Sequence, residues 1–336
     1  MADEFWRGRS VLVTGANGFI GAWVIRTLTD LGANVTGYDK SEIGALSLHD
    51  GVRDRIELVL GDLTDQALLE RTLVHRDAKT VIHLGAQSNI SFAKGGPVPA
   101  FESNIRGSWT VLEACRTTAT PETIAIASSN TVYGDQDTAP FDEEFALNAN
   151  NPYASSKACT DILARCYAAT YDLPVAIARA TNTYGGADPN LTRIVPDTLL
   201  RIIRGERPEI RSDGSPAKGY LYIKDTVSAY LTLGERAAEA DVRGKAFNFH
   251  PDEPISVLNL VKTMVKVAGR PDLEPTVLGA AGKYEYEFLS NKRAAHVLNW
   301  HPEYSMEDGL AETFEWYKQH EGSELERAAR VFSRPS

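Results

Sequence analysis

The chain has 336 residues, of which 43% are hydrophobic and 24% charged, values close to the globular average that exclude a disordered or fibrous polymer. Its net charge of -10 argues against a nucleic-acid partner, which would require a basic stripe. The three cysteines, Cys115, Cys159 and Cys166, have no metal-ligand spacing, so we expect no metal site and no disulfide framework.

Other features of the chain point to a cytoplasmic setting. No apolar run reaches the ~18 residues of a membrane span, and residues 1–9 do not form a secretory signal. We therefore expect no membrane partner and a reducing cytoplasmic location.

Short apolar runs alternate with helical patterns through the first half of the chain. Strands are expected at residues 11–13, 35–38, 56–60, 81–84, 123–127 and 175–178. Helices are expected after the first strand, ending at about residue 31, and at 65–73, 101–116 and 153–171. Strands that alternate with helices form βαβ units on a parallel sheet. The pattern predicts an α/β fold with a Rossmann-type, doubly wound parallel sheet.

A stretch rich in glycine and proline, residues 183–216, indicates a change to a smaller α/β lobe. We expect a Rossmann domain of residues 1–180, to which the chain returns at about 220–250. The smaller lobe then comprises residues 181–219 and 251–330, with helices near 257–268 and 306–318. The last dozen residues are charged with few apolar anchors, so we expect them to fray.

A glycine loop lies between the first strand and the first helix. Gly15 permits a tight turn, Gly18 lets the backbone approach a pyrophosphate, and Gly21 lets the helix pack closely on the strand. Asp39 ends the second strand, near the ~20-residue spacing expected of an acid that binds ribose hydroxyls. Because this carboxylate would repel a 2′-phosphate, the first domain is predicted to bind NAD in preference to NADP.

Tyr153 and Lys157 are four residues apart on a predicted helix and share one face. An ammonium group beside a phenol favours the ionised phenol, so the pair could exchange a proton with a substrate. With 13 tyrosines in the chain, such a spacing also arises by chance. Ser129 favours a functional interpretation of the Tyr153 and Lys157 spacing. This serine follows the strand at 123–127, at the edge where α/β sheets bind ligands. We therefore predict that these three residues are catalytic.

Together these motifs resemble those of the extended short-chain dehydrogenases/reductases, the family of nucleotide-sugar epimerases and dehydratases. The resemblance spans nearly the whole chain. It is carried by Gly15-Ala16-Asn17-Gly18-Phe19-Ile20-Gly21, Gly61-Asp62-Leu63, His83-Leu84-Gly85-Ala86-Gln87, Asn104-Ile105-Arg106-Gly107, Ser128-Ser129, Val132-Tyr133-Gly134, Pro152-Tyr153-Ala154-Ser155-Ser156-Lys157, Arg179 to Asn182, Tyr184-Gly185, Ile194-Val195-Pro196, Tyr222-Ile223-Lys224-Asp225 and Trp316-Tyr317.

The resemblance implies a set of binding residues. Asp62 and Leu63 are expected beside the adenine of NAD, and Asn104 near its nicotinamide. Along the diphosphate and nicotinamide we expect Leu84, Gly85, Ala86 and Gln87. The other expected NAD-binding residues are Gly15, Asn17, Gly18, Phe19, Ile20, Gly21, Asp39, Tyr153 and Lys157. Those for a nucleotide-diphosphate sugar are Gln87, Ser129, Asn130, Asn182, Arg193 and Lys218. Lys218 departs from the family pattern, which usually has Arg followed by an acid where this chain has Lys218-Gly219. Lysine offers a point charge in place of a bidentate fork.

The two residues after Ser129 bear on the reaction. Family members resemble one another in first transferring a hydride from the sugar to NAD while the tyrosinate takes the hydroxyl proton. A 4,6-dehydratase then requires a general acid, and the family places Asp with Glu or Lys where this chain has Asn130 and Thr131. Such acid catalysis is worth about 100- to 10,000-fold. We therefore expect an epimerase, acting at C4 of a nucleotide-linked hexose or hexuronic acid; Thr131 also argues against a sugar-acid decarboxylase.

Several alternatives stay open at this point. The opening Phe5-Trp6-Arg7-Gly8-Arg9 and the stretch 32–38 resemble CDP-glucose 4,6-dehydratases, for which Asp135 could serve as another acid. The stretch 129–135 resembles CDP-tyvelose 2-epimerases, which invert C2. A non-catalytic dinucleotide sensor is also conceivable, although Ser129, Tyr153 and Lys157 are all present. The nucleotide base and the sugar are left undetermined.

The resemblance further implies a homodimer. Family members usually pair through the two helices expected here at 101–116 and 153–171, which form a four-helix bundle with those of the partner. Helical spacing suggests Trp109, Leu112, Leu163 and Tyr167 as the seam, with packing on the sheet as the alternative.

Overall fold

The computed structural model describes residues 2–134, 139–279 and 287–332. Its centre is a seven-stranded sheet in the order β11-β6-β5-β4-β1-β2-β3, with every neighbouring pair parallel. The strands are β1 (Ser10–Thr14), β2 (Asn34–Asp39), β3 (Glu57–Leu60), β4 (Thr80–His83), β5 (Thr123–Ala127), β6 (Val175–Ala180) and β11 (Ala246–Phe249). Each residue of β4 and β5 is buried, as expected for strands covered on both faces. The predicted doubly wound α/β fold is confirmed.

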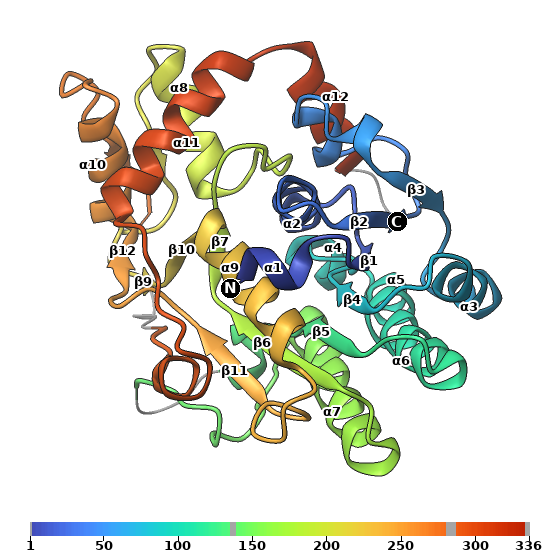
Figure 1. The fold of residues 1–336 in the computed structure, drawn as a ribbon. Coiled ribbons are helices and arrows are strands. Elements are labelled where there is room, and N and C mark those ends of the chain that lie inside the picture. The colour runs from blue at the N-terminus through green and yellow to red at the C-terminus, as the bar shows by residue number, and fades with distance from the viewer. Residues whose placement is uncertain (1, 135–138, 280–286, 333–336) are drawn as a thin grey trace.

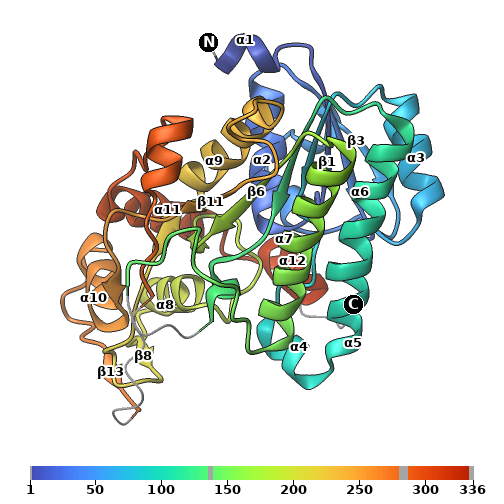
Figure 2. The ribbon, with the colours of Figure 1, turned by 90° about the horizontal axis from the view of Figure 1, so that it is seen from below.

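Helices cover both faces of this sheet (Figure 2). On one face lie α2 (Phe19–Asp30) and α9 (Ile223–Arg236), with the short α1 (Ala2–Trp6) packed on α9 through Trp6. On the other lie α3 (Gln66–His75), α6 (Gly107–Thr118) and α7 (Pro152–Tyr171). The buried apolar residues accordingly form two large clusters, one on each side of the sheet.

Helix α7 carries two of the predicted catalytic residues, and its start is well defined. The Asn151 side chain accepts a hydrogen bond from the backbone N–H of Ala154 at 3.1 Å, and Pro152 occupies the first helical position. This cap places Tyr153 in the first turn of the helix, at the carboxyl edge of the sheet.

The smaller lobe is built from short elements. It contains β7 (Asn182–Tyr184), α8 (Ile194–Ile203), β8 (Glu209–Ile210), β9 (Ala217–Lys218), β10 (Tyr220–Tyr222), β12 (Ile255–Ser256), α10 (Val257–Val267), β13 (Thr276–Val277), η5 (Ala294–Leu298) and α11 (Met306–His320). Its strands pair as β10-β7, β12-β9 and β13-β8. Between β10 and β12 the chain returns to the main sheet through α9 and β11; the expected domain boundaries stay a prediction.

Two parts of the chain differ from expectation. The helix expected at 101–116 consists of α5 (Pro97–Phe101), a π-helical turn η3 (Glu102–Arg106) and α6. The expected fraying of the last dozen residues is wrong for 325–332, which belong to helix α12 (Ser323–Phe332) with Leu325 and Ala328 buried. Figure 1 shows this red helix returning to the blue N-terminal part of the fold.

The remaining short elements are η1 (Ala45–Leu48), η2 (Arg53–Arg55), α4 (Ile90–Gly95) and η4 (Asn130–Tyr133). Within the described ranges, no helix combines the length and the apolar character that a membrane crossing requires. The described residues also include no cluster of three His, Cys, Asp or Glu side chains able to hold a metal ion.

Candidate active site

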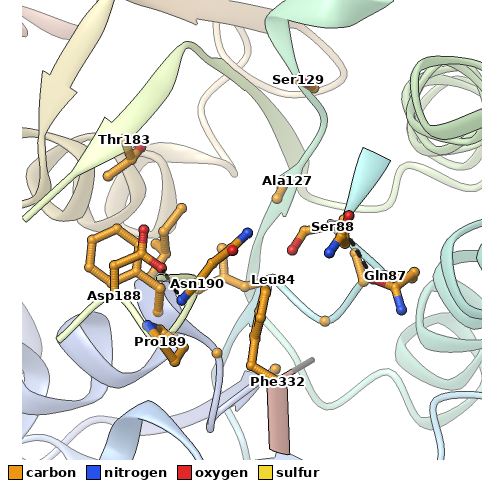
Figure 3. Close-up of a pocket in the computed structure, with 18 of the residues that line it drawn as sticks. Leu84, Gln87, Ser88, Ala127, Ser129, Thr183, Asp188, Pro189, Asn190 and Phe332 are labelled. Carbon is orange, nitrogen blue, oxygen red and sulfur yellow. Dashed lines mark hydrogen bonds between the residues drawn. The ribbon is translucent and has the colours of Figure 1, made fainter. Parts of the chain in front are cut away.

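A cavity of about 950 Å³ lies at the carboxyl edge of the main sheet, where residues of the smaller lobe also line it (Figure 3). Almost every site residue expected from the sequence contributes to its wall. These are Gly15, Asn17, Gly18, Phe19, Ile20, Gly21, Asp39, Asp62, Leu63, Leu84, Gly85, Ala86, Gln87, Ser129, Asn130, Tyr153, Lys157, Asn182, Arg193 and Lys218. The exception is Asn104.

The glycine loop leaves no room for side chains. Gly15 has a φ of +71°, and a Cβ at this position would lie 2.7 Å from the backbone nitrogen of Gly85. A Cβ on Gly21 would collide with the carbonyl oxygen of Gly15. Helix α2 starts directly after Gly18 without a side-chain cap, so its first N–H groups remain available to an anion at the cavity wall. The loop therefore fits the pyrophosphate of a dinucleotide.

Asp39 fixes the neighbouring loop as well as facing the cavity. Its carboxylate accepts hydrogen bonds from the backbone N–H groups of Asn17 at 2.9 Å and Ser41 at 3.0 Å. Burial raises the pKa of Asp39, and these two backbone bonds oppose that rise. Each carboxylate oxygen has a second lone pair, so the group can still accept hydrogen bonds from ribose hydroxyls.

Asn104 lies behind the cavity wall, and its expected place near the nicotinamide stays a prediction. Its side chain is fully buried; Oδ1 accepts from the backbone nitrogen of Gln87 at 2.6 Å, and Nδ2 donates to the carbonyl of Gln87 at 3.1 Å. Nδ2 also donates to Oγ of Ser156 at 2.8 Å. Asn104 stands in the π-helical turn η3, and it holds the loop that carries Gln87 against α7.

The three predicted catalytic residues meet at the end of β5. Lys157 is buried, its Nζ donates to the carbonyl of Ala127 at 2.8 Å, and burial lowers its pKa to about 8. Burial raises the pKa of Tyr153, while a hydrogen bond with Ser129 and the positive charge of Arg193 lower it. The ammonium of Lys157 is directed to the carbonyl of Ala127, and its effect on the pKa of Tyr153 stays a prediction.

The residues after Ser129 form a small hydrogen-bonded turn, η4. The backbone N–H of Thr131 donates to Oγ of Ser129 at 3.2 Å and its hydroxyl does so at 2.9 Å, while Ser129 donates to Oδ1 of Asn130 at 3.2 Å. Neither Asn130 nor Thr131 can act as a carboxylic acid. Asp135, the alternative acid considered from the sequence, lies outside the described residues.

Asp188 was not predicted as a site residue. Among the described residues, the carboxylates that line the cavity are Asp39, Asp62, Glu102 and Asp188. Asp188 is buried, accepts from the backbone nitrogen of Asn190 at 2.9 Å, and pairs with Nη1 of Arg193 at 3.0 Å. Burial raises its pKa, and Arg193 opposes the rise. In the sequence, Asp188-Pro189-Asn190 is indistinguishable from an ordinary turn.

The structure also explains the unusual pair Lys218-Gly219. A Cβ on Gly219 would collide with the imidazole of His250, which is fully buried behind it. An acidic residue, which the family pattern would place there, could not be accommodated without moving this ring. The carbonyl of Gly219 accepts a hydrogen bond from Nδ2 of Asn182 at 3.2 Å, which connects Asn182 to the residue that follows Lys218.

Comparison with known proteins gives one family and several relatives. The family model described as GDP-mannose 4,6 dehydratase matches residues 12–313. The chain is 30% identical to the dTDP-glucose 4,6-dehydratase of Mycolicibacterium smegmatis over 319 residues, which cover 93% of this chain and 94% of that protein. It is also 30% identical to the UDP-glucose 4-epimerase of the same organism over 316 residues, or 91% and 98% of the two chains.

A solved structure extends this likeness to three dimensions. It is the dTDP-glucose 4,6-dehydratase of Bacillus anthracis in complex with NAD, which superposes with a TM-score of 0.82 at 25% identity. The match covers 93% of this chain and 97% of that one.

Proposed function

We propose that this protein is an NAD-dependent nucleotide-sugar C4 epimerase. The chain belongs to the GDP-mannose 4,6 dehydratase family, within the extended short-chain dehydrogenases/reductases that act on nucleotide sugars. Relatives of both the dehydratase and the epimerase kind match it, so family membership alone does not choose between the two reactions. The observation that carries the choice is the turn after Ser129, where an amide and a hydroxyl stand in the positions of the dehydratase acids.

The cofactor is NAD, and the residues on the cavity wall fit it. The glycine loop leaves space and N–H groups for the pyrophosphate, and Asp39 offers acceptors to the adenosine ribose. When bound, NAD would supply reversible hydride transfer at the sugar carbon.

Asp39 leads to a test of cofactor choice. We expect NAD to bind more tightly than NADP, because a 2′-phosphate would meet this partly buried carboxylate at close range. Asp39→Ala should reduce the difference in affinity between NAD and NADP. It should also weaken the binding of NAD, since the Asn17 N–H loses its acceptor. Calorimetric titration with both cofactors checks this, and tighter binding of NADP to the wild type would refute it.

The remaining roles follow from position and charge. Tyr153 accepts the proton of the sugar hydroxyl, Ser129 shares that hydrogen bond, and Lys157 holds the ribose on the nicotinamide side. On the far wall, Asn182, Arg193 and Lys218 bind the diphosphate of the sugar nucleotide. The carboxylate of Asp188 pairs with Arg193 and partly neutralises its positive charge, so Arg193 attracts a diphosphate less strongly than an unpaired arginine would.

A substrate panel tests the reaction. The purified protein is incubated with UDP-, CDP-, GDP- and dTDP-linked hexoses and hexuronic acids, and products are identified by mass spectrometry and NMR. An epimerase returns a product of unchanged mass with one inverted carbon, and NMR separates inversion at C4 from inversion at C2. A product that has lost one water would overturn the proposal, and bound NAD with no conversion would favour a non-catalytic sensor.

The second candidate is a 4,6-dehydratase, and Asp188 is the observation that favours it. This carboxyl lines the same cavity, and burial raises its pKa, a property expected of a general acid. If the panel shows loss of water, Asp188→Asn should slow that loss while sparing NAD binding. Unchanged dehydration by Asp188→Asn would transfer the role to another acid, such as Asp135.

We also propose that the protein is a homodimer that pairs through α6 and α7.

A further inference from the structure

Helix α12 connects the end of the chain to the nucleotide half of the molecule. After α11, the chain leaves the smaller lobe and α12 packs against η1, which follows β2 of the main sheet (Figure 1). Leu325 and Ala328 anchor the helix and are 2% and 0% exposed. An ion pair of 2.6 Å between Arg204 and Glu321 holds the segment just before the helix.

The loop beneath α12 belongs to the dinucleotide site. Ile43 and Gly44 line the cavity directly before η1, and the backbone N–H of Ala45 donates to the carbonyl of Asn17 at 2.8 Å. Gly44 lies so close to Asn17 that an added Cβ would collide with it. Contacts therefore continue from α12 through η1 to the glycine loop.

The last turn of α12 reaches the cavity itself. Val331 and Phe332 are part of its lining, and Figure 3 shows Phe332 at the end of this helix. Both side chains are partly exposed, whereas the anchors Leu325 and Ala328 are sealed in the core. An aromatic ring at a cavity wall gains from contact with a flat, apolar ligand surface, because such contact removes its remaining exposed area from water.

We propose that Val331 and Phe332 form an apolar wall against the adenosine-diphosphate part of NAD, which makes the C-terminal helix a third component of the cofactor site. The inference rests on NAD as the cofactor in the proposed function. It assigns α12 to this part because the helix packs on the segment that follows Asp39, whereas Tyr153 and Lys157 stand on α7, in a different part of the wall.

Three variants on the same helix separate ligand binding from folding. Phe332→Ala removes the proposed contact, Leu325→Ala loosens the anchor, and Arg330→Ala changes an exposed side chain that serves as the control. Each is titrated calorimetrically with NAD and with ADP-ribose, which lacks the nicotinamide, and the Tm is measured without ligand.

Phe332→Ala should lower the affinities for NAD and for ADP-ribose by the same factor, about tenfold, and leave the Tm of the ligand-free protein unchanged. Leu325→Ala should lower the Tm and weaken both ligands, whereas Arg330→Ala should alter neither property. If Phe332→Ala lowers the Tm, Phe332→Leu, which keeps most of the apolar volume, should show an intermediate loss of affinity.

Wild-type affinity for ADP-ribose in Phe332→Ala, or in Phe332→Leu where the first variant is unstable, would overturn the inference. A wild-type protein that fails to bind NAD would instead refute the cofactor assignment on which the inference rests.

Discussion

Tyr153 is the residue on which the proposed chemistry depends most directly. Tyr153→Phe should abolish turnover and leave the Kd for NAD nearly unchanged, because it removes the proposed proton acceptor and no major cofactor anchor. Ser129→Ala should be milder, since loss of one shared hydrogen bond costs about 1–3 kcal/mol, or roughly 5- to 150-fold in kcat/KM. Steady-state kinetics together with NAD titration check both variants. Residual turnover of Tyr153→Phe above that of Ser129→Ala would assign proton transfer to another group.

The pKa of Lys157 leads to a prediction of how activity depends on pH. Burial lowers its pKa to about 8, so the ammonium proposed to hold the ribose is lost as the pH rises through that value. We expect kcat/KM and NAD affinity to fall above about pH 8. Lys157→Met has nothing to titrate at this position, so its weaker NAD binding should not share this fall, and a persisting fall would point to a different group.

Unfolding would not account for such a loss of activity. The folded-state pKa of Lys157 lies below its ordinary value near ~10.4, so between these values the unfolded chain binds more protons than the folded one. The contribution of this group to the free energy of unfolding therefore rises with pH in that window. Thermal melts at pH 7 and 9 distinguish the two effects.

The sequence predicts these single residues with unequal success for a physical reason. Asp39 ends β2 at a characteristic distance from the glycine loop, so local spacing is enough to predict its place at the cavity. The pairing of Asp188 with Arg193 forms within an irregular loop that has no periodicity, and the electrostatic effect of Arg193 on Tyr153 depends on the approach of two distant segments. Only the folded structure contains that information.

At the scale of elements, the π-helical turn η3 is tied to function through Asn104. Its amide makes three hydrogen bonds, two to the backbone of Gln87 and one to Oγ of Ser156, so Asn104→Ala removes all three, each at a cost of about 0.5–1.5 kcal/mol. We expect a lower free energy of unfolding in urea and reduced turnover, because the loop of Gln87 lines the cavity. Arg106→Ala, on the same turn, removes only an exposed ion pair with Glu102 and serves as the control.

The elements of the main sheet could be predicted because buried parallel strands are continuous apolar runs. The strand expected at 11–13 is β1 at Ser10–Thr14, and the one expected at 123–127 is β5 with those bounds. Helix α12 could not be predicted in this way. Its charged composition resembles that of a solvated tail, and its stability comes from Leu325 and Ala328 packing on a segment that is remote in sequence.

For the whole molecule, the distribution of apolar surface leads to the prediction of a dimer. The structure corrects the expected seam at Leu112, which is fully buried in the core, while Leu163 and Tyr167 pack partly against the same cluster. Trp109 remains 39% exposed on α6.

On α7, Ile162 and Tyr171 are 56% and 52% exposed, so both helices of the proposed bundle present apolar side chains to solvent. Burying such residues against a second copy would remove this surface from water. We therefore expect a dimer by light scattering at micromolar concentration, and a monomer for the double variant Trp109→Glu/Ile162→Glu. Val74→Glu is the matched control, because Val74 is 57% exposed but lies on α3, outside the proposed interface. A wild-type monomer, or a dimer that survives the double substitution, would refute pairing through α6 and α7.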